Sequence, residues 1–265
     1  MGRTDIDTAN PIVLVVLRAF IAMAAAAVGG VIGMSKKTIS HKTLCSLVSV
    51  AAGALLAVTT VNIIPETVEL LGGVRATAGI LVGTLVFAGI GKYVYFMCPA
   101  CAASATAHES GYLRLGLLLM IAMGIHSTVD GLAITAGTKT ASMAGLLILF
   151  AVSYHKIPEG LALVSVARLA GYSRAKALGV TLLIELTTAI GALAGVLLLR
   201  GMDKFWLGIT LAAVAGSFTY TVGFAVLREM YAHEKQSIIL YALIGFASIL
   251  GIGYLLAGIG IHHVH

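Results

Sequence analysis

The sequence is poor in charge. Asp, Glu, Lys and Arg make up 11% of its 265 residues, whereas about a quarter of the residues of a soluble domain are charged. Hydrophobic residues make up 59%, and the mean hydropathy is +1.03. So few charges cannot cover the surface of a soluble protein of this length. The composition therefore excludes a soluble domain and predicts an all-α polytopic membrane protein.

Cysteine is also scarce. The odd count of three cysteines, Cys45, Cys98 and Cys101, predicts no disulfide framework. Cys98 and Cys101 form a C-x-x-C motif with His108 nearby, and a metal or redox role for that motif stays open. The start, MGRTDIDTANP, carries two aspartates ahead of its apolar run. This is a poor secretory signal, and we expect an uncleaved first span.

The net charge of +6 does not indicate a nucleic-acid partner. Lys and Arg lie mainly in short segments between apolar runs, where they act as a topology signal. The first, third, fifth and seventh connections between the apolar runs hold ten of these Lys and Arg residues. The other connections and the two termini hold five. Because such residues collect on the cytoplasmic side, we predict that both termini lie outside. Short loops and compact size favour a prokaryotic plasma membrane.

About 20 mostly apolar residues cross a bilayer, and the chain has eight such runs. They are residues 11–33, 44–68, 75–97, 113–136, 142–168, 175–199, 205–228 and 237–261. The breaks are short, so we expect a single transmembrane transport domain over residues 1–265. The 31 glycines recur through the spans, which favours a tightly packed bundle.

Two related stretches stand out in the fourth and fifth spans. Residues 126–131 read HSTVDG and residues 155–160 read HKIPEG, and both fit H-x-x-x-[DE]-G-L-A-[IL], 29 residues apart. The two spans cross the membrane in opposite directions. Such an echo is typical of an inverted pair of half-sites.

Each stretch places an imidazole and a carboxylate one helical turn apart. His126 and Asp130 form the first pair, and His155 and Glu159 form the second. Ionisable groups inside a membrane are costly and indicate a functional site, and this ligand set suits Zn²⁺ and related ions. A divalent ion would also balance the buried carboxylates. The alternative is that each pair only hydrogen-bonds across the bundle.

Further polar residues lie in the predicted spans. Pro158 frees the carbonyl of Tyr154 for coordination or simply kinks the helix. Asn62 and Glu66, beside Pro65, line a pathway or meet water near the end of the second span. Glu185 is a ligand, a proton acceptor or a partner of Lys156. Less specific candidates are Arg18, Arg228, Glu229, His41, His108 and the terminal histidines His262, His263 and His265.

The motifs HSTVDGLAI (126–134) and HKIPEGLALVS (155–165) resemble those of the ZIP (Zrt-, Irt-like protein) family of divalent metal transporters. The segments IIPE (63–66) and AGSFTYTVGFAVLRE (215–229) add to the resemblance, which covers essentially the whole chain. It implies a 3+2+3 helix arrangement with inverted-repeat character. It also implies uptake of Zn²⁺, or of Fe²⁺, Mn²⁺ or Cd²⁺, into the cytoplasm by elevator-like or rocking motion.

The resemblance makes His126, Asp130, His155 and Glu159 the primary ligands and Glu185 an accessory carboxylate. Bacterial members with two metal ions commonly have Asn or Asp after each histidine, where this chain has Ser127 and Lys156. A protonated ammonium is no ligand, and neighbouring carboxylates favour its charge. We therefore predict one metal ion, with the ammonium of Lys156 in the place of a second. Asp130 stands where Glu is commoner.

Three rival functions remain at the level of sequence. A proton-coupled metal exporter also uses H-x-x-x-D pairs, but eight spans and no cytoplasmic C-terminal domain argue against it. An intramembrane zinc-dependent hydrolase would need an open coordination position and a base, for which Glu185 is available. No further nucleophile or oxyanion signature supports that enzyme. A structural scaffold is the third rival, and a homodimer is an open possibility.

Overall fold

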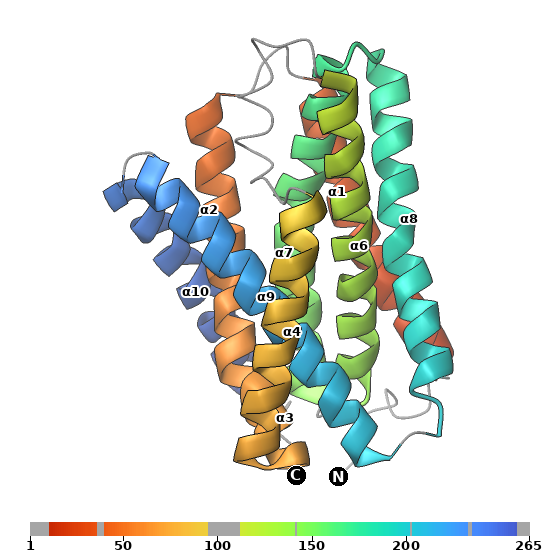
Figure 1. Ribbon diagram of the computed structural model, residues 1–265, viewed down its shortest axis with the longest axis vertical. Helices are drawn as coiled ribbons and strands as arrows, with labels where there is room; N and C mark the ends of the chain where they lie inside the picture. The colour runs from red at the N-terminus through yellow and green to blue at the C-terminus, as the bar shows by residue number, and fades with distance from the viewer. Residues whose placement is uncertain are drawn as a thin grey trace.

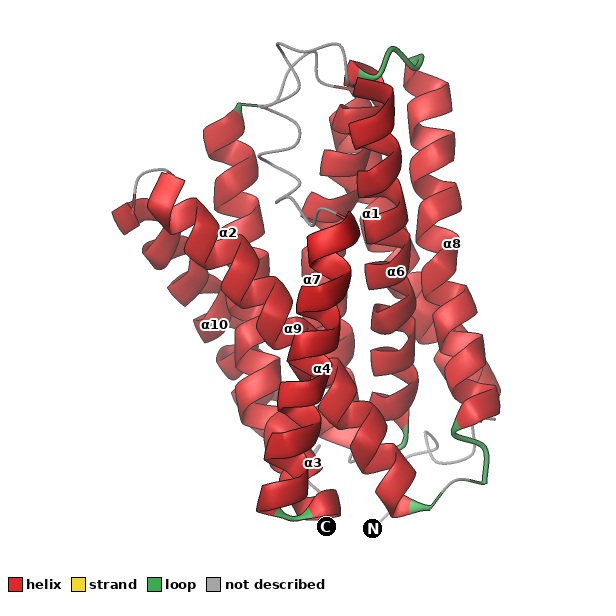
Figure 2. Cartoon of the chain, in the orientation of Figure 1, coloured by secondary structure: helices red, strands yellow, loops and turns green. Residues whose placement is uncertain are grey.

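The computed structural model describes residues 11–35, 40–94, 112–140, 142–201, 203–232 and 235–258. Every regular element in these ranges is helical (Figure 2). The helices are α1 (Pro11–Ser35), α2 (His41–Val58), a π-helical turn η2 (Thr59–Ile63), α3 (Ile64–Leu71), α4 (Gly73–Val94), α6 (Tyr112–Thr138), α7 (Ser142–Leu169), α8 (Arg174–Leu198), α9 (Lys204–Ala232) and α10 (Lys235–Gly258).

The predicted spans match these helices to within a few residues, with α2, η2 and α3 together forming the second span. Counted with α2, η2 and α3 as one span, the described residues form eight helical spans. Seven of these are long and apolar enough to cross a membrane, which confirms the all-α polytopic membrane fold. The exception is α6, whose 27 residues give it the required length. The described part of α6 carries His126, Ser127, Thr128 and Asp130, and these polar residues lower its mean hydropathy.

Local sequence signals mark where several of the helices begin and end. The side chains of Ser40 and Ser173 accept hydrogen bonds from backbone N–H groups in the first turns of α2 and α8. Gly72 follows α3 with a φ of 76°, and Gly171 follows α7 with a φ of 87°. Glycine adopts this left-handed conformation without steric cost. Short turns of this kind hold neighbouring helices antiparallel.

The helices pack into two units (Figure 1). The first unit contains α1, α6, α7 and α8, and the second contains α2–α3, α4, α9 and α10. Exchanging α1 with α8, α2–α3 with α9, α4 with α10 and α6 with α7 turns each helix contact into another contact that is also present. The two helices of each exchanged pair run in opposite directions through the bundle. The packing therefore has the predicted 3+2+3 inverted-repeat pattern.

Glycines let the helices within each unit touch backbone to backbone. In the first unit, a Cβ on Gly160 of α7 would overlap the carbonyl oxygen of Ala26 in α1, and one on Gly131 of α6 would overlap that of Thr188 in α8. These two contacts are exchanged by the inverted repeat. In the second unit, Gly53–Ala242 between α2 and α10 and Gly216–Ile80 between α9 and α4 are a second such pair. Small residues thus fix the helix crossings.

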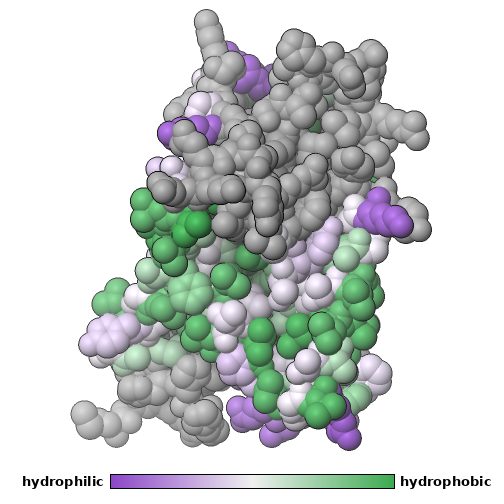
Figure 3. Space-filling model, turned by 60° about the vertical axis from the view of Figure 1, so that its left-hand side comes forward, coloured by the Kyte–Doolittle hydropathy of each residue, from purple (hydrophilic) through white to green (hydrophobic). Residues whose placement is uncertain are grey.

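The outside of the bundle is apolar. Large exposed side chains include Leu183 and Leu197 on α8, Leu85 on α4 and Leu255 on α10. Figure 3 shows a hydrophobic band across the described part of one face, with hydrophilic side chains gathered along its lower edge. This pattern fits a belt that faces lipid tails and ends at the interfacial region.

Candidate metal centre

Two antiparallel helices of the first unit, α6 and α7, bring the two histidine–carboxylate pairs together. His126, Asp130, His155 and Glu159 are all buried. Each offers a ligand atom, and these four atoms lie within 4.8 Å of one another. Ligand atoms of a tetrahedral zinc site are about 3.4 Å apart, because each lies 2.0–2.2 Å from the ion. Small side-chain movements would therefore close the cluster around one ion.

The imidazole of His155 is held in a defined orientation. Its Nδ1 lies 3.1 Å from the carbonyl oxygen of Ala151, one turn earlier on α7. An N–H at Nδ1 donates to that carbonyl and leaves Nε2 facing the cluster, 3.1 Å from Oδ2 of Asp130. Phe218 of α9 packs edge-on against the ring, with centroids 6.4 Å apart. Support of this kind orients a histidine ligand and sets its tautomer.

Lys156 lies beside the cluster and joins three helices. Its Nζ is 3.0 Å from a carboxylate oxygen of each of Asp130 on α6, Glu159 on α7 and Glu185 on α8. It also donates to the hydroxyl of Ser127 at 2.6 Å, and that hydroxyl donates to Oε1 of Glu159 at 2.9 Å. The ammonium is completely buried. It therefore acts as a fixed internal cation among three carboxylates.

Glu185 is not one of the four clustered ligand residues, but it contacts Lys156 beside them. The sequence leaves it open as a ligand, a proton acceptor or a partner of Lys156, and in this structure it pairs with Lys156. It is on the buried face of α8, together with Thr181 and Thr188. Sequence alone does not reveal this pairing, because it depends on how α8 packs against α7.

The pathway candidates of the second span lie at an irregular turn. Asn62 is buried in η2, and its Oδ1 has no hydrogen-bond partner. Glu66 is half-buried one turn further along, in α3. Pro65 has no N–H to give to the preceding turn, and the π-helical turn Thr59–Ile63 lies just before it. Such turns are often found at functional sites.

The remaining candidate residues lie away from the metal centre or are not among the residues that the structure describes. Arg18 is buried, donates to Thr138 at 3.5 Å and lies against Gly145, so it supports the turn between α6 and α7. The side chains of Arg228, Glu229 and His41 are not described. Cys98, Cys101, His108, His262, His263 and His265 lie outside the described residues.

Sequence reasoning missed the role of the glycine that follows each carboxylate. Gly131 comes directly after Asp130, and Gly160 directly after Glu159. Both are contact points for a neighbouring helix. The repeated glycine in the two motifs was the available signal. Each motif thus combines a ligand turn with a helix-crossing point.

A bundle of membrane-length helices with two imidazoles and carboxylates buried at one point defines a membrane protein that handles a divalent metal ion. A family model described as "ZIP Zinc transporter" matches residues 98–253. The chain is also 32% identical over 249 residues to the zinc transporter ZupT of Corynebacterium efficiens, covering 88% of this chain and 92% of that protein.

Two further zinc transporters named ZupT are similar. The one from Corynebacterium glutamicum is 31% identical over 88% of this chain and 94% of its own length, and the one from Chlorobium luteolum is 30% identical over 86% and 92%. The chain belongs to the ZIP zinc transporter family. The predictions of the family and of a transporter rather than an enzyme are confirmed, so the hydrolase and the scaffold are not kept.

Proposed function

We propose that this chain takes up Zn²⁺ by binding one ion to His126, Asp130, His155 and Glu159 and exposing it to each side of the membrane in turn. The observation that carries the proposal is that four buried ligand atoms from two adjacent helices lie within 4.8 Å of one another. Imidazole and carboxylate ligands bind zinc well. The cargo of the relatives named above is also zinc.

Charge balance supports a single ion. Three carboxylates, Asp130, Glu159 and Glu185, surround one ammonium, that of Lys156. With these groups ionised, the cluster carries two surplus negative charges, which one divalent ion neutralises. Buried charges are costly unless they are compensated. A second divalent ion at the same place would leave a buried positive surplus.

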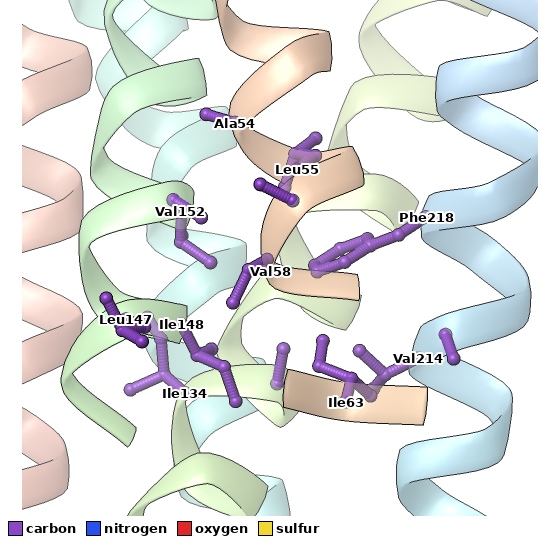
Figure 4. Packing of buried hydrophobic residues seen from close by; sticks show 14 of the residues in the cluster. Ala54, Leu55, Val58, Ile63, Ile134, Leu147, Ile148, Val152, Val214 and Phe218 are labelled. Carbon is purple, nitrogen blue, oxygen red and sulfur yellow. The ribbon is translucent and has the colours of Figure 1, made fainter. Parts of the chain in front are cut away.

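The contacts between the two units suggest how the ion is moved. The interhelical hydrogen bonds described here, such as Thr135 to Ala192 and Thr84 to Gly216, lie within one unit or the other. Between the units lies an apolar layer in which Leu55 and Val58 of α2 and Phe218 of α9 face side chains of α6 and α7 (Figure 4). Apolar contacts are not directional, so a layer of this kind resists sliding less than a polar one. The first unit, with the metal site, moves relative to the second.

The predicted topology orients the chain in the membrane. Ten Lys and Arg residues in the odd-numbered connections, against five elsewhere, favour a cytoplasmic location for those connections and an outside location for both termini. In this orientation, uptake carries zinc from the outside face into the cytoplasm of a prokaryotic cell. Bacterial relatives support this host membrane. Fe²⁺, Mn²⁺ and Cd²⁺ are further cargo candidates, since they accept the same ligands.

Uptake of ⁶⁵Zn²⁺ into proteoliposomes tests the site. His155→Ala and Glu159→Ala are each expected to reduce uptake by at least tenfold and to weaken zinc binding in detergent. Glu69→Ala removes an exposed carboxylate of α3 and serves as the control with normal uptake. Normal uptake and binding in both ligand variants would disprove the site. Lost uptake with normal binding would assign these residues to movement and not to coordination.

A further inference from the structure

A groove runs along the outer face of the second unit, between α4 and α9. It has a volume of about 750 Å³ and is lined by α4 from Arg75 to Phe87 and by α9 from Phe205 to Ala213. Clefts that bind small ligands have volumes of about 300–1,000 Å³. The groove involves no residue of the candidate metal centre.

The floor of the groove is formed by backbone and small side chains. A Cβ on Gly79 would lie 2.9 Å from the Cβ of Ala212, and one on Gly83 would lie 3.1 Å from the Cα of Ala213. The two helices therefore approach closely and leave no room for side chains at these positions. Val82 and Val86 are exposed along the groove. The result is an open apolar groove on the outer face of the second unit.

The length of the groove matches one leaflet of a bilayer. The thirteen residues from Arg75 to Phe87 rise about 18 Å along α4, and half of the hydrocarbon core is about 15 Å thick. Arg75 is near the start of α4, and Phe205 is near the start of α9. The groove thus begins at the end of the bundle and extends to about the middle of the membrane.

The outer end of the groove has the chemistry of a membrane interface. Arg75 is the only charged residue of the lining, it is exposed, and no carboxylate among the described residues pairs with it. Phe205 and the exposed Trp206 pack edge to face, with centroids 5.7 Å apart. The carboxylate of Asp203 accepts from the backbone N–H of Trp206. Arg and Trp are typical of the headgroup level.

We propose that this groove binds one anionic phospholipid, with its phosphate on the guanidinium of Arg75 and one acyl chain along Gly79 and Gly83. The guanidinium carries a charge complementary to that of a phosphate and can donate bidentate hydrogen bonds to it. The apolar groove, which is about as long as one leaflet is thick, accepts the acyl chain. The lipid covers the close contact between α4 and α9 and anchors the second unit in the membrane.

Native mass spectrometry of the purified protein tests the proposal with phosphatidylglycerol and phosphatidylcholine of matched chains. One retained phosphatidylglycerol is expected, bound about fivefold more tightly than phosphatidylcholine. Arg75→Gln should remove this preference. Ala78→Trp, which fills the groove from its exposed rim, should prevent retention of either lipid. Arg200→Gln is the control, because Arg200 is an exposed arginine that does not line the groove.

Equal retention of the two lipids by the natural chain, or an unchanged preference in Arg75→Gln, would overturn the proposal. A second copy of the chain is the competing occupant of the groove. If Ala78→Trp converts a dimer to a monomer and leaves lipid retention unchanged, the groove is a subunit interface and the lipid site is disproved.

Discussion

Lys156 makes the candidate centre differ from a simple cluster of metal ligands. Its ammonium is within 3.0 Å of three carboxylates from three helices. Asp in its place would leave four carboxylates, whose charge two divalent ions balance. We predict that Lys156→Asp binds two zinc ions per chain in equilibrium dialysis. Lys176→Asp, which changes an exposed lysine of α8, should still bind one.

A single ion bound to Lys156→Asp would contradict the idea that the ammonium occupies the place of a second cation. Loss of all zinc binding would also contradict this idea, because the four proposed ligands are unchanged in the variant. Circular dichroism and gel filtration check that the variant is folded.

Ser127 connects the ammonium to the ligand Glu159. Its hydroxyl accepts from Lys156 and donates to Oε1 of Glu159, which leaves Oε2 turned toward His155 at 3.9 Å. Removing a group that orients a ligand typically costs 10–100-fold in metal affinity. Ser127→Ala is expected to raise the zinc Kd by about this factor in isothermal titration.

Thr128→Ala is the matched control for Ser127. The hydroxyl of Thr128 bonds only to Gly124 of its own helix. We expect its zinc Kd to stay within about twofold of the natural value. Equal effects of the two substitutions would show that Ser127 acts through helix stability and not through the ligand.

Much of the candidate centre could be predicted from sequence. The i, i+4 spacing of His126 and Asp130, and of His155 and Glu159, indicates one face of each helix, and the repeat on adjacent spans indicates that the faces meet. The pairing of Glu185 with Lys156 could not be predicted. It depends on the rotation of α8 about its axis, which side chains from several helices determine together.

At the scale of the helices, glycine contacts control how closely the elements approach. A methyl group at Gly160 would overlap the carbonyl oxygen of Ala26, and one at Gly131 would overlap that of Thr188. Overpacking typically costs 1–3 kcal/mol. We predict that Gly131→Ala and Gly160→Ala each lower the unfolding temperature in detergent by several degrees.

Gly179→Ala and Gly251→Ala provide the comparison for those variants. Both glycines lie within helices, and nothing lies within 4 Å of an added Cβ. Their unfolding temperatures should stay the same or rise slightly, because alanine favours helix more than glycine does. A similar fall in all four variants would argue against the contact explanation.

The spans themselves could be predicted because lipid requires long apolar segments, and the ends of most helices differ from the predicted ends by one to four residues. Which helices touch could not be predicted. Neighbours in the sequence are often not the closest partners, as the packing of α1 on α7 and of α2 on α10 shows. Most spans present small residues on more than one face, so the sequence pattern alone does not select a partner.

At the scale of the whole molecule, the proposed motion requires the two units to slide past each other at the apolar layer. A Cβ on Gly253 of α10 would lie 3.6 Å from Leu147 of α7, across this layer. In a chain without its natural cysteines, we predict that a short thiol cross-link between Gly253→Cys and Leu147→Cys blocks zinc uptake but not zinc binding. Cleaving the link should restore uptake.

A link within the first unit is the control. A Cβ on Gly124 of α6 would lie 3.8 Å from the side chain of Thr187 in α8. Cross-linking Gly124→Cys to Thr187→Cys should leave uptake close to normal, since these helices move together. Undiminished uptake with the Gly253–Leu147 link intact would refute a relative displacement of the units.

The exchange of helix contacts by the inverted repeat also bears on reversibility. Inverted repeats that pack alike give the outward- and inward-facing arrangements similar internal contacts, so neither has a large built-in advantage in free energy. A carrier of this kind speeds equilibration and does not itself choose a direction. Net flux would then follow the free zinc concentration on the two sides. A cell that chelates zinc strongly in its cytoplasm would draw the metal inward through such a carrier without expending ATP at the transporter.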